Sequence, residues 1–131
     1  MMRRILGIVA GLVAWTCVAT AGNLIVRVSW PAYMAVEASM RFTLAMMIAR
    51  LALGALSSVC AGLAVARIVK GDRTAVVALG IILVGLFVPV HYGLWDRFPV
   101  WYHVVFLASL FPLVLLGATL NVRSHTPARA V

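Results

Sequence analysis

Arg50, His91 and His103 are the side chains of this sequence whose chemistry could bind a ligand or cofactor. Arg50 interrupts a long apolar segment, 42–66, whereas His91 ends one apolar segment and His103 begins the next. Counted along each segment, these side chains fall in the outer half of a membrane, and a tight hairpin would bring the histidines to similar depth. Histidines on neighbouring helices could hold a b-type haem, with the guanidinium pairing a propionate. They could equally bind a quinone head group or a metal.

Each of these residues also has a purely structural interpretation. Zinc requires three or four ligands, and no third is evident beside the histidines, so no metal site is predicted. Histidines at a membrane interface can bond to water or backbone, and backbone carbonyls with a nearby carboxylate could satisfy Arg50. The leading expectation is therefore a protein without a cofactor, and haem b or a quinone is the alternative.

No enzyme motif accompanies these residues. The sequence contains no P-loop, GxGxxG, HExxH or CxxC motif, and we predict no catalytic residue. Its acidic residues, Glu37, Asp72 and Asp96, lie at or outside the ends of the apolar segments. None stands inside a span, where pumps and transporters place a proton-carrying carboxylate. This placement disfavours a proton-coupled transporter.

The composition identifies a membrane protein. The chain of 131 residues is 65% hydrophobic and 11% charged, whereas about a quarter of the residues of a soluble domain are charged. Since a crossing needs about 20 apolar residues, the sequence predicts spans at about 5–26, 42–66, 74–92 and 101–120. The predicted fold is an all-α membrane protein, a four-transmembrane-helix bundle in one domain, 1–122, followed by a disordered cytoplasmic tail, 123–131.

The connection between the first two spans is amphipathic. Ser29 could cap a helix with Pro31 in its first turn, and no further proline or glycine follows before the middle of the second span. We therefore expect a short interfacial helix that runs straight into that span, with Glu37 and Arg41 forming a helical ion pair. The aromatic residues of the second outer turn, around 92–102, indicate a belt at the membrane boundary.

Small residues mark faces on which the first two spans could pack against neighbouring helices. These positions are Gly7 and Gly11 on the first span, and Gly54, Ser58 and Gly62 on the second. Arg50 shares the face of the second set. A central arginine costs about 2.5 to 3.5 kcal/mol on insertion scales, so we expect it to face the packed interior of the bundle.

The formal charge of +8 comes from basic residues in the segments that flank the spans. We therefore interpret these residues as determinants of membrane orientation and not as a nucleic-acid-binding face. With both termini cytoplasmic, most cations lie on the inside. Those expected inside are Arg3, Arg4, Arg67, Lys70, Arg73, Arg123 and Arg129, against Arg27, Arg41 and Arg97 outside. A bacterial inner membrane suits this pattern.

The first span also imitates a signal peptide, with 19–21 as a cleavage site, but its apolar run continues to Val26, which favours an uncleaved helix.

The sequence thus predicts a small polytopic membrane protein that contacts the lipid bilayer and has no catalytic chemistry of its own. The leading function is an accessory subunit or assembly partner of a membrane complex, or a homo-oligomer. The alternatives are a haem- or quinone-binding electron-transfer module that uses Arg50, His91 and His103, or a small oligomeric transporter. Ligand, partner and oligomeric state stay open.

Overall fold

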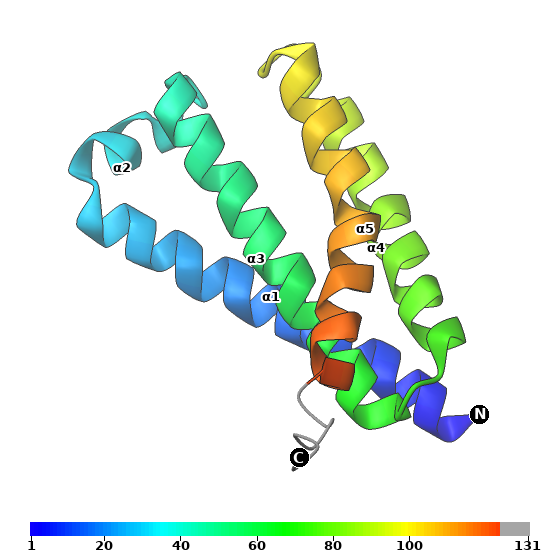
Figure 1. Ribbon diagram of the computed structural model, residues 1–131. Coiled ribbons are helices and arrows are strands. Elements are labelled where there is room, and N and C mark those ends of the chain that lie inside the picture. The colour runs from blue at the N-terminus through cyan, green and yellow to red at the C-terminus, as the bar shows by residue number, and fades with distance from the viewer. Residues whose placement is uncertain (124–131) are drawn as a thin grey trace, which may run out of the picture.

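Four long apolar helices and one short helix form the computed structural model, which describes residues 1–123 (Figure 1). The helices are α1 (Met2–Ser29), α2 (Pro31–Glu37), α3 (Leu44–Val69), α4 (Arg73–Gly93) and α5 (Val100–Arg123). All except α2 are long and apolar enough to cross a membrane. Even α4, with 21 residues, reaches about 32 Å and so matches a hydrocarbon core of roughly 30 Å. The predicted four-helix membrane fold is confirmed.

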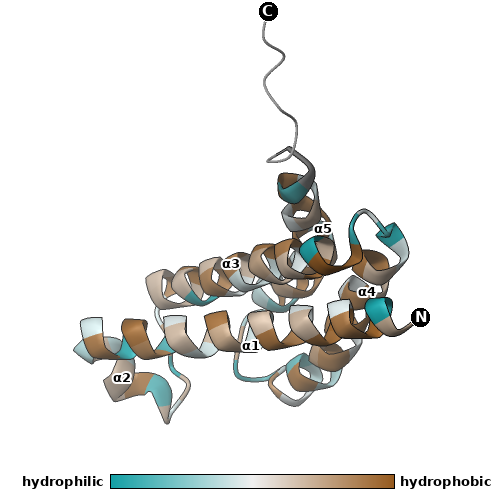
Figure 2. Ribbon diagram, turned by 90° about the horizontal axis from the view of Figure 1, so that it is seen from below, coloured by the Kyte–Doolittle hydropathy of each residue, from teal (hydrophilic) through white to brown (hydrophobic). Residues whose placement is uncertain are grey.

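The outside of the bundle is apolar. Figure 2 shows hydrophobic residues along the long helices, and large aliphatic side chains such as Ile25 and Ile81 are 65% and 60% exposed. Such a surface is unfavourable in water, because each exposed aliphatic side chain forgoes about 1.5 to 3 kcal/mol of burial free energy. These helices therefore contact a lipid bilayer.

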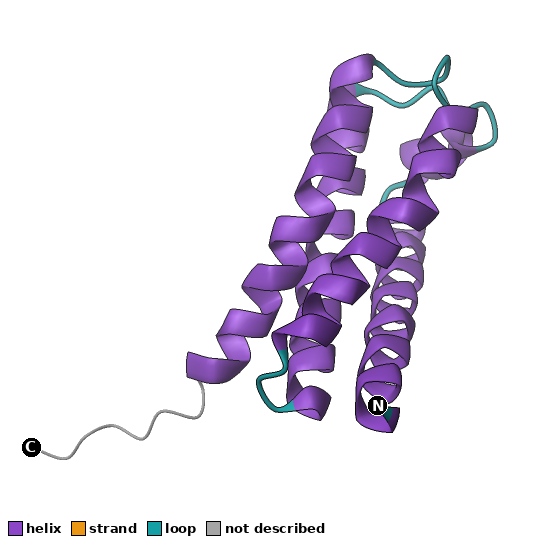
Figure 3. Cartoon of the chain, turned by 90° about the vertical axis from the view of Figure 1, so that its right-hand side faces the viewer, coloured by secondary structure: helices purple, strands orange, loops and turns teal. Residues whose placement is uncertain are grey.

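The chain ends and the loops divide the bundle into two ends. The N-terminus, the α3–α4 turn and the end of α5 lie at one end, which we call the inner end (Figure 3). The loops 38–43 and 94–99 lie at the other, the outer end. Toward the outer end the long helices diverge into two pairs, α1 with α3 and α4 with α5 (Figure 1).

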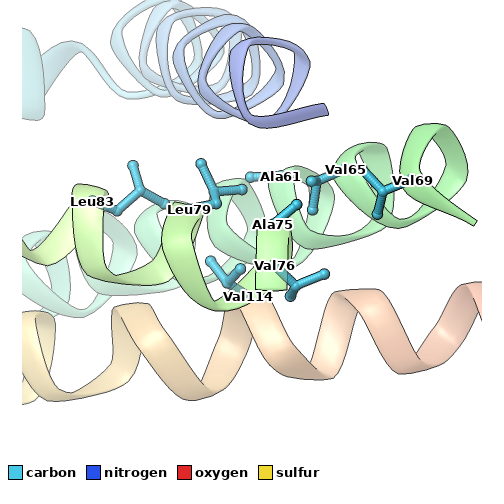
Figure 4. Close-up of a cluster of buried hydrophobic side chains, with 8 residues drawn as sticks. All are labelled: Ala61, Val65, Val69, Ala75, Val76, Leu79, Leu83 and Val114. Carbon is cyan, nitrogen blue, oxygen red and sulfur yellow. The ribbon is translucent and has the colours of Figure 1, made fainter. Parts of the chain in front are cut away.

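The inner half holds the hydrophobic core. Side chains of α3, α4 and α5 interdigitate there, as Figure 4 shows. The cluster consists of Ala61, Val65, Val69, Ala75, Val76, Leu79, Leu83 and Val114. Close packing thus holds the inner parts of α3, α4 and α5 together. A cavity of about 400 Å³ lies beside this cluster, lined by residues such as Val69, Val76 and Leu115.

Glycines let α3 and α5 touch through their backbones. A Cβ atom on Gly62 would lie 1.9 Å from the carbonyl oxygen of Val114, and one on Gly117 would lie 2.0 Å from that of Val59. Backbone atoms cannot yield as side chains can, so only glycine fits at these positions. Small residues have this role in many membrane helix pairs.

The other small residues singled out in the sequence also pack within this chain. A Cβ atom on Gly7 would lie 2.6 Å from Val69 of α3, and one on Gly11 would lie 2.5 Å from Leu79 of α4. A Cβ atom on Gly54 would lie 2.8 Å from Phe106 of α5. Ser58 is buried, and its hydroxyl accepts a hydrogen bond from Trp15 Nε1 at 3.1 Å. These positions therefore form contacts between the helices of one molecule.

The expectation that the interfacial helix runs straight into the second span is wrong. Helix α2 ends at Glu37, and residues 38–43 separate it from α3. Met40 has a left-handed backbone, with φ of 55°. Thr43 then caps a new helix, because its side-chain oxygen accepts a hydrogen bond from the Met46 backbone N–H at 3.4 Å. The cap explains why helix formation starts again at Leu44.

This break also changes the partner of Glu37. Its carboxylate pairs with Arg27 Nε at 2.8 Å, and not with Arg41 as the helical spacing predicted, because no helix joins positions 37 and 41. At the other end of the chain, Arg123 belongs to α5 and not to the predicted tail. The rest of that tail, 124–131, lies outside the described residues.

Asp72 ties the start of α1 to the turn between α3 and α4. Its Oδ1 caps α4 by accepting from the Thr74 N–H at 2.9 Å, and its Oδ2 pairs with Arg4 Nε at 2.5 Å. The turn itself uses left-handed conformations at Lys70 and Gly71, with φ of 49° and 92°. The hydrogen bond from Arg4 holds the pKa of the Asp72 carboxyl below its usual range.

We expect Asp72→Asn to reduce the acid sensitivity of the protein. Because the folded pKa of Asp72 is lowered, its stabilising effect is complete above the unfolded value of about 3.9. It is lost as the pH falls through the folded pKa. The thermal midpoint in detergent, followed by circular dichroism between about pH 5 and 2, should fall less in Asp72→Asn than in the wild type. Asp96→Asn is the matched control, and an equal change in both variants would contradict this role.

Candidate ligand-binding site

A cavity of about 350 Å³ lies between the two helix pairs in the outer half of the bundle. Aromatic rings form much of its wall, namely Trp15, Phe42, Phe87, Phe98 and Phe106. Its polar lining residues are Asn23, Glu37, Arg50, His91 and Tyr102. An enclosure of this kind, mostly apolar with a few polar groups, is typical of small-molecule sites.

Arg50 is the central cation of this cavity. It lies about 9 Å along the helix axis from Leu44, where α3 begins. Its Nη1 donates a hydrogen bond to the Tyr33 hydroxyl at 2.7 Å, and its Nε donates to the Tyr102 hydroxyl at 3.3 Å. The guanidinium carbon also stands 4.8 Å from the ring centre of Phe42, within range of a cation–π interaction. Within residues 1–123 no carboxylate forms an ion pair with it.

A row of polar groups on α1 and α2 holds one side of Arg50 in place. The Tyr33 hydroxyl donates to Asn23 Oδ1 at 3.2 Å, and Asn23 Nδ2 donates to Glu37 Oε1 at 3.5 Å. Glu37 in turn pairs with Arg27. Among the described residues, the carboxylate that lines the cavity, Glu37, therefore forms its ion pair with Arg27 and does not neutralise the charge of Arg50.

The two histidines are in direct contact behind Tyr102. His91 Nδ1 and His103 Nδ1 lie 2.7 Å apart, and their side chains are 5% and 1% exposed. The His91 ring stacks on Tyr102 and Phe106 at centroid distances of 5.9 and 4.5 Å. Tyr102 thus touches both Arg50 and His91, so the structure brings together the three ligand-binding candidates that the sequence suggested.

Sequence reasoning missed the tyrosines that hold Arg50. Tyr33 lies on the short α2, and Tyr102 belongs to the turn interpreted as a membrane-interface belt. Tyr92 is 82% exposed, as expected for a residue of such a belt, whereas Phe98 and Tyr102 are buried. A signal was available in the spacing of Tyr102, Phe106 and Leu110, which repeats every four residues and marks a buried helix face.

As placed, the Nδ1 atoms of His91 and His103 cannot both be axial ligands of one haem iron. A metal–imidazole bond is about 2.0 to 2.1 Å long, so nitrogens on opposite sides of an ion lie about 4 Å apart. The separation of 2.7 Å leaves no room for an ion between His91 and His103. In the described part of the chain no group of three or more His, Cys, Asp or Glu residues could hold a metal ion.

The fold and the cavity define a small multi-pass helical membrane protein whose outer half encloses a cationic, aromatic-lined site. Comparisons with protein-family models, with curated proteins and with solved structures find no match to this chain.

Proposed function

We propose that this protein binds the head group of an anionic amphiphile in the cavity around Arg50. The observation that carries the proposal is a guanidinium at membrane depth that faces a cavity and whose hydrogen-bond partners within residues 1–123 are the hydroxyls of Tyr33 and Tyr102. A charge at the centre of a span costs about 2.5 to 3.5 kcal/mol on insertion scales, and Arg50, about 9 Å from the start of α3, incurs part of that cost. Arginine binds carboxylates and phosphates through its planar fork of donors, so an anionic ligand would supply the missing counter-charge.

The surroundings of Arg50 suit an amphiphile better than a free anion. The cavity volume of about 350 Å³ falls within the range of roughly 300 to 1,000 Å³ found for small-molecule pockets. Rings such as Phe42 and Phe98 line it beside the guanidinium. They offer apolar contact to the first methylene groups of an acyl chain, whose remainder would lie among lipids.

We expect the purified protein, held in a neutral maltoside detergent, to bind dodecyl phosphate and dodecanoate saturably. Isothermal titration calorimetry measures the affinity. The fluorescence of Trp15, which lines the cavity, should report the same binding, and Trp15→Phe should remove that optical response without removing the heat. Dodecanol is the uncharged control. Equal binding of dodecanol would contradict an anion site, as would the absence of saturable binding of both anions.

The other candidate functions have less support. The accessory-subunit and homo-oligomer roles were motivated by small-residue faces, and Gly7, Gly11 and Gly54 face helices of the same chain. A quinone could accept hydrogen bonds from Arg50, but its neutral head group would leave the guanidinium charge unmatched. A haem iron bound by Nδ1 of both histidines would require them to give up their mutual contact.

The topology that we propose places the inner end in the cytoplasm. The inner end carries most of the cations, and the positive-inside rule assigns such an end to the cytoplasmic side. The described cations there are Arg3, Arg4, Arg67, Lys70, Arg73 and Arg123, against Arg27, Arg41 and Arg97 at the outer end. In a bacterial inner membrane the cavity would then lie in the periplasmic half of the bilayer and would meet lipids of the outer leaflet.

A further inference from the structure

We propose that His91 is a second ligand-binding residue of this site, which donates its Nε2–H to the head group, and that His103 fixes the tautomer that makes this possible. The class of ligand that this arrangement selects is a phosphate-bearing amphiphile. The inference rests on the proposed function, because it concerns the same cavity and the same head group.

The tautomer follows from the contact between the rings and from one buried nitrogen. With both rings neutral, one Nδ1 of the pair donates and the other accepts across the separation of 2.7 Å. His103 Nε2 is buried and has no hydrogen-bond partner among the described residues. Among backbone groups, a buried N–H without an acceptor is rarer than an under-satisfied acceptor, and we extend this preference to the imidazole. His103 therefore carries its proton on Nδ1, and its orphaned Nε2 is the bare acceptor.

The same choice sets the proton on His91. Its Nδ1 must accept from His103, so its own proton resides on Nε2. His91 lines the cavity and His103 does not. Since Nδ1 is occupied by the contact with His103, Nε2 is the polar atom that His91 offers to a ligand. Stacking on Tyr102 and Phe106 fixes the ring plane.

Tyr102 places this donor next to Arg50. The Tyr102 hydroxyl accepts from Arg50 Nε, its ring stacks on His91, and its own proton has no acceptor in the described part of the chain. Arg50, Tyr102 and His91 all line the same cavity, so we infer that the guanidinium, the Tyr102 hydroxyl and His91 Nε2 can donate to one head group. A carboxylate has only two oxygens, and a guanidinium alone can occupy both. A phosphate monoester presents three non-bridging oxygens in different directions and can satisfy all of these donors.

The test compares dodecyl phosphate with dodecanoate at pH 7.5 by titration calorimetry in neutral maltoside. We expect the wild type to bind the phosphate about tenfold more tightly. His91→Phe keeps a stacking ring but removes the donor. It should weaken phosphate binding by about tenfold and leave dodecanoate binding within about twofold. Unchanged phosphate binding in His91→Phe would overturn the inference.

A second measurement does not depend on the folding of a variant. Nitrogen-15 NMR of histidine-labelled wild type contains signals from three histidines, of which His125 lies outside the described residues and is identified by its absence from a His125→Gln spectrum. Of the remaining two, one should be protonated on Nδ1 and the other on Nε2, and only the Nε2–H signal should shift on addition of dodecyl phosphate. A shift of the Nδ1–H histidine alone would overturn the inference. If the wild type binds neither probe, the proposed function fails and this inference with it. If Arg50-dependent binding persists while His91→Phe has no effect, only this inference fails.

Discussion

Arg50→Met will abolish measurable binding of dodecyl phosphate, with a rise in dissociation constant of at least about a hundredfold. A hydrogen bond to a charged group contributes about 1.5 to 3 kcal/mol, and the variant loses the charge together with every guanidinium donor. Methionine is unbranched and apolar, so it can fill the space of the arginine stem between Tyr33 and Tyr102. Titration calorimetry with the purified variant measures the loss.

The stability of the same variant shows whether Arg50 binds a ligand or mainly holds the helices together. We expect the unliganded Arg50→Met protein to unfold within about 1 kcal/mol of the wild type, or to be more stable, because an unpaired charge leaves the membrane interior. If Arg50 served mainly to hold the helices together, its loss from Tyr33 and Tyr102 would lower the thermal midpoint markedly. Arg41→Met is the matched control. It removes an exposed cation outside the cavity and should change neither binding nor stability.

The largest structural effect is expected at the contact between α3 and α5. Gly62→Ala would place a methyl group 1.9 Å from the carbonyl oxygen of Val114, so the helices must move apart. Overpacking of a tight interior costs about 1 to 3 kcal/mol, occasionally more, and here the opposing atom is backbone. We expect a loss at or above the upper end of that range, measured by thermal or denaturant unfolding in detergent.

Gly85→Ala is the control for this prediction. Gly85 is also inside a membrane helix, α4, but a Cβ atom there would meet nothing within 4 Å. Alanine is favoured over glycine in a helix by up to about 1 kcal/mol, so this variant should be as stable as the wild type or more stable. Similar destabilisation by Gly62→Ala and Gly85→Ala would contradict the proposed helix contact.

Hydropathy sufficed to predict the membrane class and the four spans, because a bilayer constrains helix length and composition more than it constrains sequence. The proximity of His91 and His103 was also accessible from the sequence. A short turn between two spans places the residues that flank it at the same depth, and the structure adds that their rings touch.

Tertiary packing decided the features that sequence reasoning missed. The continuous helix was predicted because no proline or glycine follows Pro31 before Gly54, and the Thr43 cap was overlooked. The break after α2 then let Tyr33 turn inward to Arg50. Tyr102 has the composition of an interface residue, and only its place on a buried helix face shows that it serves the cavity. Neither the volume of the cavity nor the matching of Glu37 to Arg27 could be deduced from local patterns.

Native mass spectrometry of the protein released from membranes by a mild neutral detergent tests the central claim most directly. The wild type should retain a phosphate-bearing amphiphile that survives removal of the detergent, and Arg50→Met should lose it while Arg41→Met keeps it. A wild type that carries no anionic amphiphile, or an Arg50→Met variant that carries the same one, would contradict the account.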